Sequence, residues 1–345
     1  MKNILKSSIA MMAGALALVS CSDWTDPKPV DVSYDNITEA DPETYAKYLA
    51  NLRAYRTNGH KKAYAWYANT GSFSTQADHV SAVPDSLDVL VFTAPGLIHP
   101  SLLDEMVVKR SETGMQMAWE VSYDDIRAAW DDKNLRADLA VAENPELPRP
   151  FVPEWSDFLA DSLSTTLAYG ETYGFDRMIV GYTGKSTALM TPAELQAYSA
   201  DQASFMIPVL KWLEGHKGVA HDFRGTPVNL TDKTVASDAG IIFLQESLKA
   251  SGTIELAYIM SLNAIAGIPS DRFAMLAPLP LLDPAQASVG MWGNGYAACE
   301  IARWTRAQDN VAALGMTNLY DGYFNPAFIY PVCRKAMQVL NPAAK

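Results

Sequence analysis

The chain has 345 residues, with 27 Lys and Arg against 39 Asp and Glu, which gives a formal net charge of −12 at pH 7. Hydrophobic residues at 49% and charged residues at 19% are ordinary for a folded globular protein and exclude a disordered or collagen-like chain. The negative charge, without any run of basic residues, argues against a nucleic-acid-binding protein, because phosphate contacts need clustered Lys and Arg.

Residues 1–21 have the pattern of a secretory signal peptide. Lys2 and Lys6 give a positive start, and residues 9–19 form an apolar run that is shorter than the roughly 20 residues a bilayer core needs. The run ends in Leu-Val-Ser-Cys, which resembles the bacterial lipobox. We therefore expect Cys21 to be lipidated and to become the mature N-terminus. A plain signal peptide with a chance cysteine is the alternative.

Residues 22–40 are polar and contain proline, so we expect a flexible tether between the lipid and a folded part at residues 41–345. Acidic residues directly after Cys21 resemble the surface-export signals of Bacteroidota lipoproteins. The resemblance implies a protein that its lipid holds in the outer membrane and that faces the outside of the cell. Retention at the periplasmic face is the alternative.

From residue 41 onward, strand-like and helical stretches alternate. Short apolar runs predict strands at residues 62–67, 87–92, 114–122, 174–182, 218–223, 240–245, 272–277 and 315–320. Helices are expected from Pro42 and at about residues 100–109, 124–142, 154–173, 191–215, 254–266, 297–309 and 326–340. This alternation predicts a parallel α/β protein, and the eight strands favour a closed (β/α)8 TIM barrel. An open doubly wound sheet is disfavoured because no GxGxxG sequence is present.

The fourth predicted strand reads Gly-Phe-Asp-Arg-Met-Ile-Val-Gly-Tyr-Thr at residues 174–183, and it resembles the D-G-x-D-x-D-x-E motif of glycoside hydrolase family 18. That family includes chitinases and the endo-β-N-acetylglucosaminidases that cut N-glycan cores. The overlay puts Asp176 on the first Asp, Ile179 on the second, Gly181 on the third and Thr183 on the Glu, with Tyr182 retained. Residues 217–230 and 268–273 resemble a Bacteroidota lipoprotein branch of the same family.

The resemblance implies a barrel that lacks its catalytic chemistry. In family enzymes the sugar's own 2-acetamido oxygen attacks the anomeric carbon, an Asp orients the acetamido group, and the Glu protonates the leaving oxygen. Ile179, Gly181 and Thr183 would point into the barrel together, and none of them carries a carboxyl group. Loss of the general acid alone lowers a rate by a factor of about 10²–10⁴. We therefore expect no catalytic residue at these positions.

Aromatic and planar polar residues near the predicted strand ends suggest a sugar-binding cleft. A Trp or Tyr ring can cover the apolar face of a pyranose, while planar polar side chains bind its hydroxyls. The expected glycan contacts are Trp66, Tyr67, Asn69, Asp176, Tyr182, Gln245, Trp292, Asn318, Tyr320, Asp321 and Tyr323. Core packing is the alternative for each ring, and a structural role is the alternative for Asp176.

Neither a metal nor another cofactor is expected. The five His are scattered without the spacing of metal ligands. Cys299 and Cys333 are either two buried thiols or a disulfide, and the sequence leaves both open.

These features predict a cell-surface lipoprotein that is a pseudoenzyme on a family 18 barrel. It would capture N-glycan, or another glycan that contains N-acetylglucosamine, for a glycan-utilisation system and its outer-membrane importer. One alternative is an active endo-β-N-acetylglucosaminidase or chitinase-like hydrolase whose carboxylates have moved, with Glu120 and Glu246 as candidates. The other is a structural or protein-interaction lipoprotein that binds no sugar.

Overall fold

The computed structural model describes residues 41–244, 253–325 and 328–342. Cys21, the expected tether, Gln245 and Glu246 lie outside the described residues. The barrel belongs to a compact unit that begins at Leu49. Within the described parts of the chain, no helix is both long and apolar enough to span a membrane.

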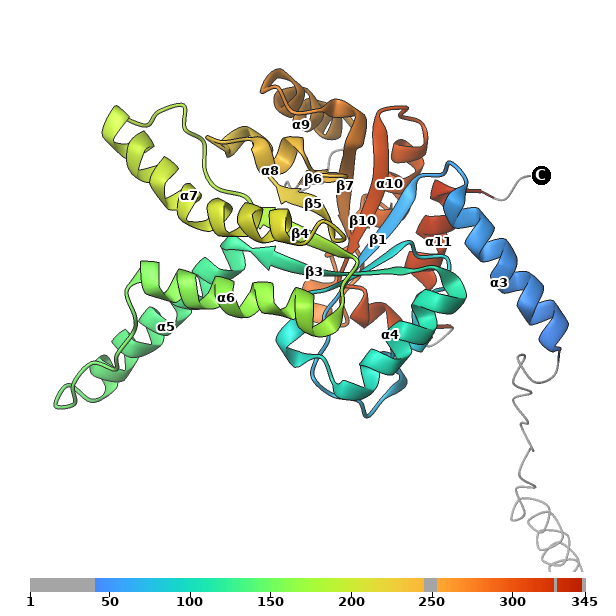
Figure 1. Cartoon of the computed structure of the whole chain (residues 1–345), viewed down its shortest axis with the longest axis horizontal. Helices are drawn as coiled ribbons and strands as arrows, with labels where there is room; N and C mark the ends of the chain where they lie inside the picture. The colour runs from blue at the N-terminus through green and yellow to red at the C-terminus, as the bar shows by residue number, and fades with distance from the viewer. Residues whose placement is uncertain (1–40, 245–252, 326–327, 343–345) are drawn as a thin grey trace, which may run out of the picture. The chain divides into compact units, whose positions relative to one another are not determined.

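Eight parallel strands close into a barrel in the order β1-β10-β7-β6-β5-β4-β3-β2, which confirms the predicted (β/α)8 fold (Figure 1). The strands are β1 (Lys62–Tyr67), β2 (Val89–Phe92), β3 (Gln116–Ser122), β4 (Arg177–Tyr182), β5 (Ala220–Gly225), β6 (Ile242–Leu244), β7 (Phe273–Pro278) and β10 (Val311–Thr317). Each strand pairs with its neighbours in the chain, and β10 closes the ring against β1.

Helices lie between successive barrel strands in the chain, with α3 before β1 and α11 after β10 (Figure 1). They are α3 (Pro42–Thr57), α4 (Pro100–Thr113), α5 (Tyr123–Glu143), α6 (Trp155–Tyr173), α7 (Pro192–Gly215), α8 (Thr234–Ser237), α9 (Thr253–Ile265), α10 (Ala297–Arg306) and α11 (Pro331–Leu340). Local sequence sets their ends: Thr191 and Glu194 form a capping box before α7, and Gly114 ends α4 at a φ of 71°. A short antiparallel hairpin, β8 (Met291–Trp292) and β9 (Gly295–Tyr296), precedes α10.

The eighth barrel strand differs from the prediction, because it covers Val311–Thr317 and not residues 315–320. Backbone pairing with β1 and β7 uses the earlier apolar residues of this segment. Asn318 then takes a left-handed φ of 63°, which a strand cannot continue through. Asn318 and Tyr320 therefore lie in the loop that follows the strand.

The inside of the barrel is a separate apolar cluster with charged groups set into it. Its buried members are Tyr64, Trp66, Val89, Val91, Ala118, Ile179, Ile241, Phe243, Ala274 and Ala313. Asp222 is fully buried and binds Arg177 through two contacts of 2.7 and 2.6 Å, and Tyr64 also donates to it at 3.2 Å. Polar β5 is a genuine barrel strand because its inward-facing charges, Asp222 and Arg224, have buried partners.

Candidate functional site

The fourth strand brings no carboxylate to the mouth of the barrel, the end at which the strands finish. Ile179 is fully buried in the inner apolar cluster, and Gly181 follows it on the same face of the strand. Thr183 is half-buried just beyond the end of the strand. Its backbone N–H donates to Asp124 at 2.8 Å, and its carbonyl accepts from Asn229 at 2.9 Å. These backbone contacts hold the chain at the residue expected to replace the family's acid.

A carboxylate from the neighbouring strand lies beside Gly181. A Cβ atom added at residue 181 would lie 2.9 Å from Oε1 of Glu120 and 3.0 Å from the Cβ of Ser122. The strands are registered so that Glu120 is opposite Ile179 and Ser122 is opposite Gly181. Glu120 therefore occupies space that remains open only because residue 181 is glycine.

Glu120 is held by two other interior side chains. The indole Nε1 of Trp66 donates to Oε2 at 2.8 Å, and Nε of Arg224 lies 3.0 Å from Oε1 in an ion pair. The Glu120 side chain is only 4% exposed. Burial raises the pKa of Glu120 from 4.5 to about 6, although the positive charge of Arg224 acts in the opposite direction.

Aromatic and aliphatic side chains fill the centre of the barrel beside this ion pair. The Trp66 ring meets Phe243 edge to face, with the ring centroids 5.1 Å apart. Gly315 leaves room for the Trp66 ring, because a Cβ there would lie 2.9 Å from a ring carbon and 2.6 Å from Cδ2 of Leu276. The middle of the barrel is thus filled by packed side chains.

Four of the residues expected to contact glycan are buried in the fold. Trp66, Tyr67, Tyr182 and Asn69 are 2%, 1%, 1% and 5% exposed. Tyr67 donates to the carbonyl of Ala77 at 2.7 Å, and the Asn69 side chain donates to a backbone carbonyl at 2.6 Å. The structure therefore gives Trp66, Tyr67 and Asn69 packing and bridging roles, whereas Tyr182, although buried, lines a cavity of about 470 Å³ together with Tyr123 and Tyr198.

Asp176 also has structural partners. It lies just before β4, at the opposite end of the strand from the barrel mouth. Its carboxylate forms an ion pair with Arg110 at 2.9 Å and accepts the backbone N–H of Met117 at 2.8 Å. Asp176 thus links α4, β3 and β4 and lies away from the expected cleft.

The remaining described candidates gather in the loops after β7 and β10. All five are half-buried: Trp292, Asn318, Tyr320, Asp321 and Tyr323. Asn318 donates to the carbonyl of Leu279 at 3.3 Å, and Asp321 accepts the backbone N–H of Leu282 at 3.1 Å. The Tyr320 hydroxyl instead donates to Asp78, which lies between β1 and β2, at 3.2 Å. The two loops are thereby joined at one side of the barrel mouth.

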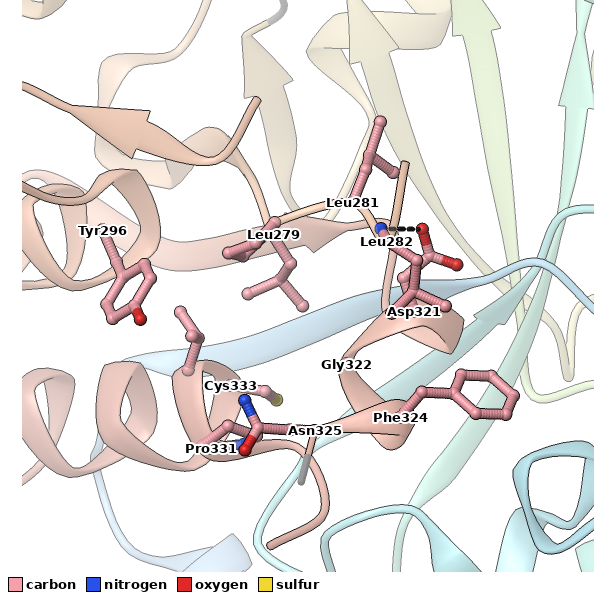
Figure 2. Close-up of a pocket in the computed structure, with 12 residues that line it drawn as sticks. Leu279, Leu281, Leu282, Tyr296, Asp321, Gly322, Phe324, Asn325, Pro331 and Cys333 are labelled. Atoms are coloured by element: carbon pink, nitrogen blue, oxygen red, sulfur yellow. Dashed lines mark hydrogen bonds between the residues drawn. The ribbon is translucent and has the colours of Figure 1, made fainter. Parts of the chain in front are cut away.

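A cavity of about 210 Å³ lies between these joined loops and the start of α11 (Figure 2). Of the expected residues that the structure describes, only Asp321 lines it, next to two further aromatic residues, Tyr296 and Phe324. Tyr296 is 40% exposed and Phe324 42% exposed. Their places in the chain could have identified them, because Tyr296 directly precedes α10 and Phe324 lies in the loop after the eighth strand.

A second cavity, of about 390 Å³, lies beside Glu120 between α5, α6 and the loop after β2. Its lining is polar and includes Ser122, Asp125 and Asp161. Within residues 41–244, 253–325 and 328–342, no group of three or more His, Cys, Asp or Glu side chains is arranged to hold a metal ion. Cys299 and Cys333 are both buried free thiols.

Comparison with known proteins gives one family and one fold. The family model for glycoside hydrolase family 18, BT1044-like, matches residues 25–339. A solved structure of the Bacteroides protein BT1044 superposes with a TM-score of 0.53 at 14% identity, covering 88% of this chain and 95% of that one. The endo-β-N-acetylglucosaminidase of Cordyceps militaris gives 0.53 at 12% identity, covering 85% and 95%. No curated protein sequence matches the chain. At these identities the solved structures show a shared fold.

Proposed function

We propose, since this chain belongs to the BT1044-like branch of glycoside hydrolase family 18, that it binds glycans without hydrolysing them. A structurally similar mutant of the Cordyceps militaris enzyme was solved in complex with fucosyl-N-acetylglucosamine-Asn. That complex supports glycans that contain N-acetylglucosamine as the class of ligand. The branch name and the barrel do not by themselves separate an enzyme from a binding protein, so the argument depends on the residues of the barrel mouth.

The observation that carries the proposal is the contact between Gly181 and Glu120. The family's third Asp cannot occupy position 181 while Glu120 remains where it is, because the added Cβ would lie 2.9 Å from Oε1. The ion pair with Arg224 and the bond from Trp66 hold Glu120 in this place. The loss of the carboxylate at position 181 is therefore accompanied by an interior in which Glu120 takes up the adjacent space.

One observation favours the alternative of an active hydrolase with a relocated acid. Glu120 has a pKa raised to about 6, which suits a general acid near neutral pH, and it lines the cavity between α5 and α6. Against this, its side chain is 4% exposed and is engaged by Trp66 and Arg224. A general acid must reach the leaving oxygen of the substrate, and both carboxylate oxygens of Glu120 are engaged by interior side chains.

The experiment that separates the two functions is an assay for released reducing ends on N-glycans and chitin oligomers. Wild-type protein and Glu120→Gln are compared over hours at pH 6 and pH 7. The proposal predicts no product from either protein. Product from the wild type that Glu120→Gln abolishes would establish the hydrolase.

The proposal extends to where the protein acts. The lipobox-like sequence ending at Cys21 and the acidic residues after it support a lipid anchor in the outer membrane and exposure at the cell surface. A surface-held glycan-binding protein would deliver its ligand to an outer-membrane importer and to a true hydrolase. Protease added to intact cells tests the orientation, since a surface-exposed protein is digested and a periplasmic one is protected.

A further inference from the structure

We infer that the cavity between the loops after β7 and β10 is a subsite for one neutral pyranose residue, with Tyr296 as its stacking platform. The inference rests on the proposed function and adds the place and the chemistry of binding. Glu120 is not among the residues that line this cavity, so binding here does not need the catalytic centre of the family.

The size of the cavity suits a single ring. Its volume of about 210 Å³ lies below the roughly 300–1,000 Å³ typical of sites for drug-sized ligands. Figure 2 shows Tyr296 on one side, Phe324 on the other, and Leu279 between them, with the Phe324 ring directed away from Tyr296. Tyr296 is thus the exposed ring that faces the cavity, and one sugar residue would stack on it while the rest of the glycan remains outside.

The lining has the mixed chemistry that a sugar requires. Leu279, Val332 and Cys333 form apolar walls against which the C–H face of a pyranose can be buried. Asp321 and Asn325 bring polar groups to the same space, and a carboxylate oxygen accepts from sugar hydroxyls. No cationic side chain is found among the described residues that line the cavity. This composition favours a neutral sugar over an anionic ligand such as sialic acid or a phosphate.

The walls are fixed before any ligand arrives. The Leu282 backbone donates to Asp321 at 3.1 Å across the two loops, as the dashed line in Figure 2 marks. The Tyr330 backbone donates to the carbonyl of Gly322 at 2.8 Å and ties the same loop to the start of α11. A Cβ atom added at Gly290 would lie 2.4 Å from the backbone nitrogen of Pro280. The start of the β8–β9 hairpin therefore packs directly on the residues that follow β7. A preformed site loses little conformational entropy on binding.

The test is calorimetric titration of the full-length protein with chitotetraose, a high-mannose glycopeptide and a complex-type glycopeptide. Tyr296→Ala is expected to raise Kd at least about tenfold for the glycan that binds, as truncation of an aromatic anchor does. Tyr296→Phe keeps the ring and is expected to stay within about threefold of the wild type. Tyr258→Ala is the matched control, because Tyr258 is 61% exposed on α9 and does not line the cavity.

Thermal melts accompany each titration. Tyr296 is 40% exposed and its side chain does not cap α10, so its truncation is expected to leave the fold intact. An unchanged Kd for Tyr296→Ala, with wild-type protein that does bind glycan, would overturn the subsite and leave the proposed function standing. Failure of the wild type to bind any of the three glycans would overturn the proposed function, and the subsite with it.

Discussion

Glu120 on β3 and Gly181 on β4 share one space inside the barrel, because a Cβ atom at residue 181 would lie 2.9 Å from the Glu120 carboxylate. The motif overlay predicts that Gly181 stands where family enzymes have an Asp. The absence of that Asp and the presence of a buried Glu on the next strand are therefore one coupled feature of the interior. Restoring the motif residue alone would place two acidic side chains in the same volume.

Gly181→Ala tests this coupling directly. We expect it to lower the free energy of unfolding by about 1–3 kcal/mol, as overpacking of a buried site does. In a Glu120→Ala background the same substitution is expected to cost less, because the clashing oxygen is gone and only the tight contact with Ser122 remains. Urea unfolding of the wild type, both single variants and the double variant measures the interaction energy. Additive effects would contradict the shared space.

The ion pair predicts a strong and pH-dependent effect of Arg224→Met. Removing one partner of a buried pair leaves an uncompensated charge and typically costs about 3–5 kcal/mol. The cost is expected near pH 8, where Glu120 must be ionised, and is expected to shrink near pH 5, where Glu120 can be protonated. Chemical denaturation at the two pH values checks this. An equal loss at both would show that the charge of Glu120 is not responsible.

Glu120 itself is expected to shape the pH dependence of stability. Its pKa in the folded protein, about 6, is above its ordinary value of 4.5, so the folded state binds the proton more tightly than the unfolded state. The resulting stabilisation is complete below about pH 4.5 and is lost as the pH rises through 6, a change of about 2 kcal/mol. The measurement is the difference between the stability curves of the wild type and Glu120→Gln. Parallel curves over this range would contradict the raised pKa.

Trp66→Ala and Tyr296→Ala are expected to behave in opposite ways. Trp66 is 2% exposed and donates to Glu120, so its truncation is expected to lower the free energy of unfolding by about 3–5 kcal/mol. Tyr296 is 40% exposed, and its truncation is expected to change stability by less than about 1 kcal/mol while it weakens glycan binding. Denaturation and titration of both variants check this. Comparable losses of stability would show that Tyr296 is a packing residue as well.

Cys21→Ala tests the anchor. Without the cysteine no lipid can be attached at the lipobox-like sequence, and the protein is expected in the soluble fraction after cell lysis. Fractionation and immunoblotting compare it with the wild type, and Cys299→Ala serves as a control because Cys299 is a buried thiol within the barrel unit. Continued membrane association of Cys21→Ala would mean that another feature anchors the protein.

The strands could be predicted well where the sequence is apolar, and less well elsewhere. Residues 62–67 match β1 as predicted because both faces of a barrel strand are covered and the run is continuously apolar. A continuously apolar run does not show which face each side chain takes. The burial of both Trp66 and Tyr67, which are adjacent and lie on opposite faces of β1, could therefore not be predicted. The eighth strand was placed about four residues late, because the turn at Asn318 depends on a backbone conformation that the residue type does not dictate.

The candidate site was predictable only in part. The sequence predicts that Ile179, Gly181 and Thr183 replace the motif acids, because this prediction needs only the residue types and their spacing. The position of Glu120 beside Gly181 depends on the register of β3 against β4, which the sequence of either strand alone does not determine. Tyr296 was missed for a similar reason, because its exposure follows from how the β8–β9 hairpin packs on the loop after β7.

Binding of a glycan without its hydrolysis can be tested on a single sample. Wild-type protein is titrated with an N-glycan glycopeptide in a calorimeter at pH 7. The glycopeptide is then recovered from the calorimeter's sample cell, and its mass is measured by mass spectrometry. We expect a saturable heat with a Kd in the range of about 10⁻⁶ to 10⁻³ M and recovery of the glycan at its original mass. Recovery of the two fragments left by cleavage within the N-acetylglucosamine core would contradict it.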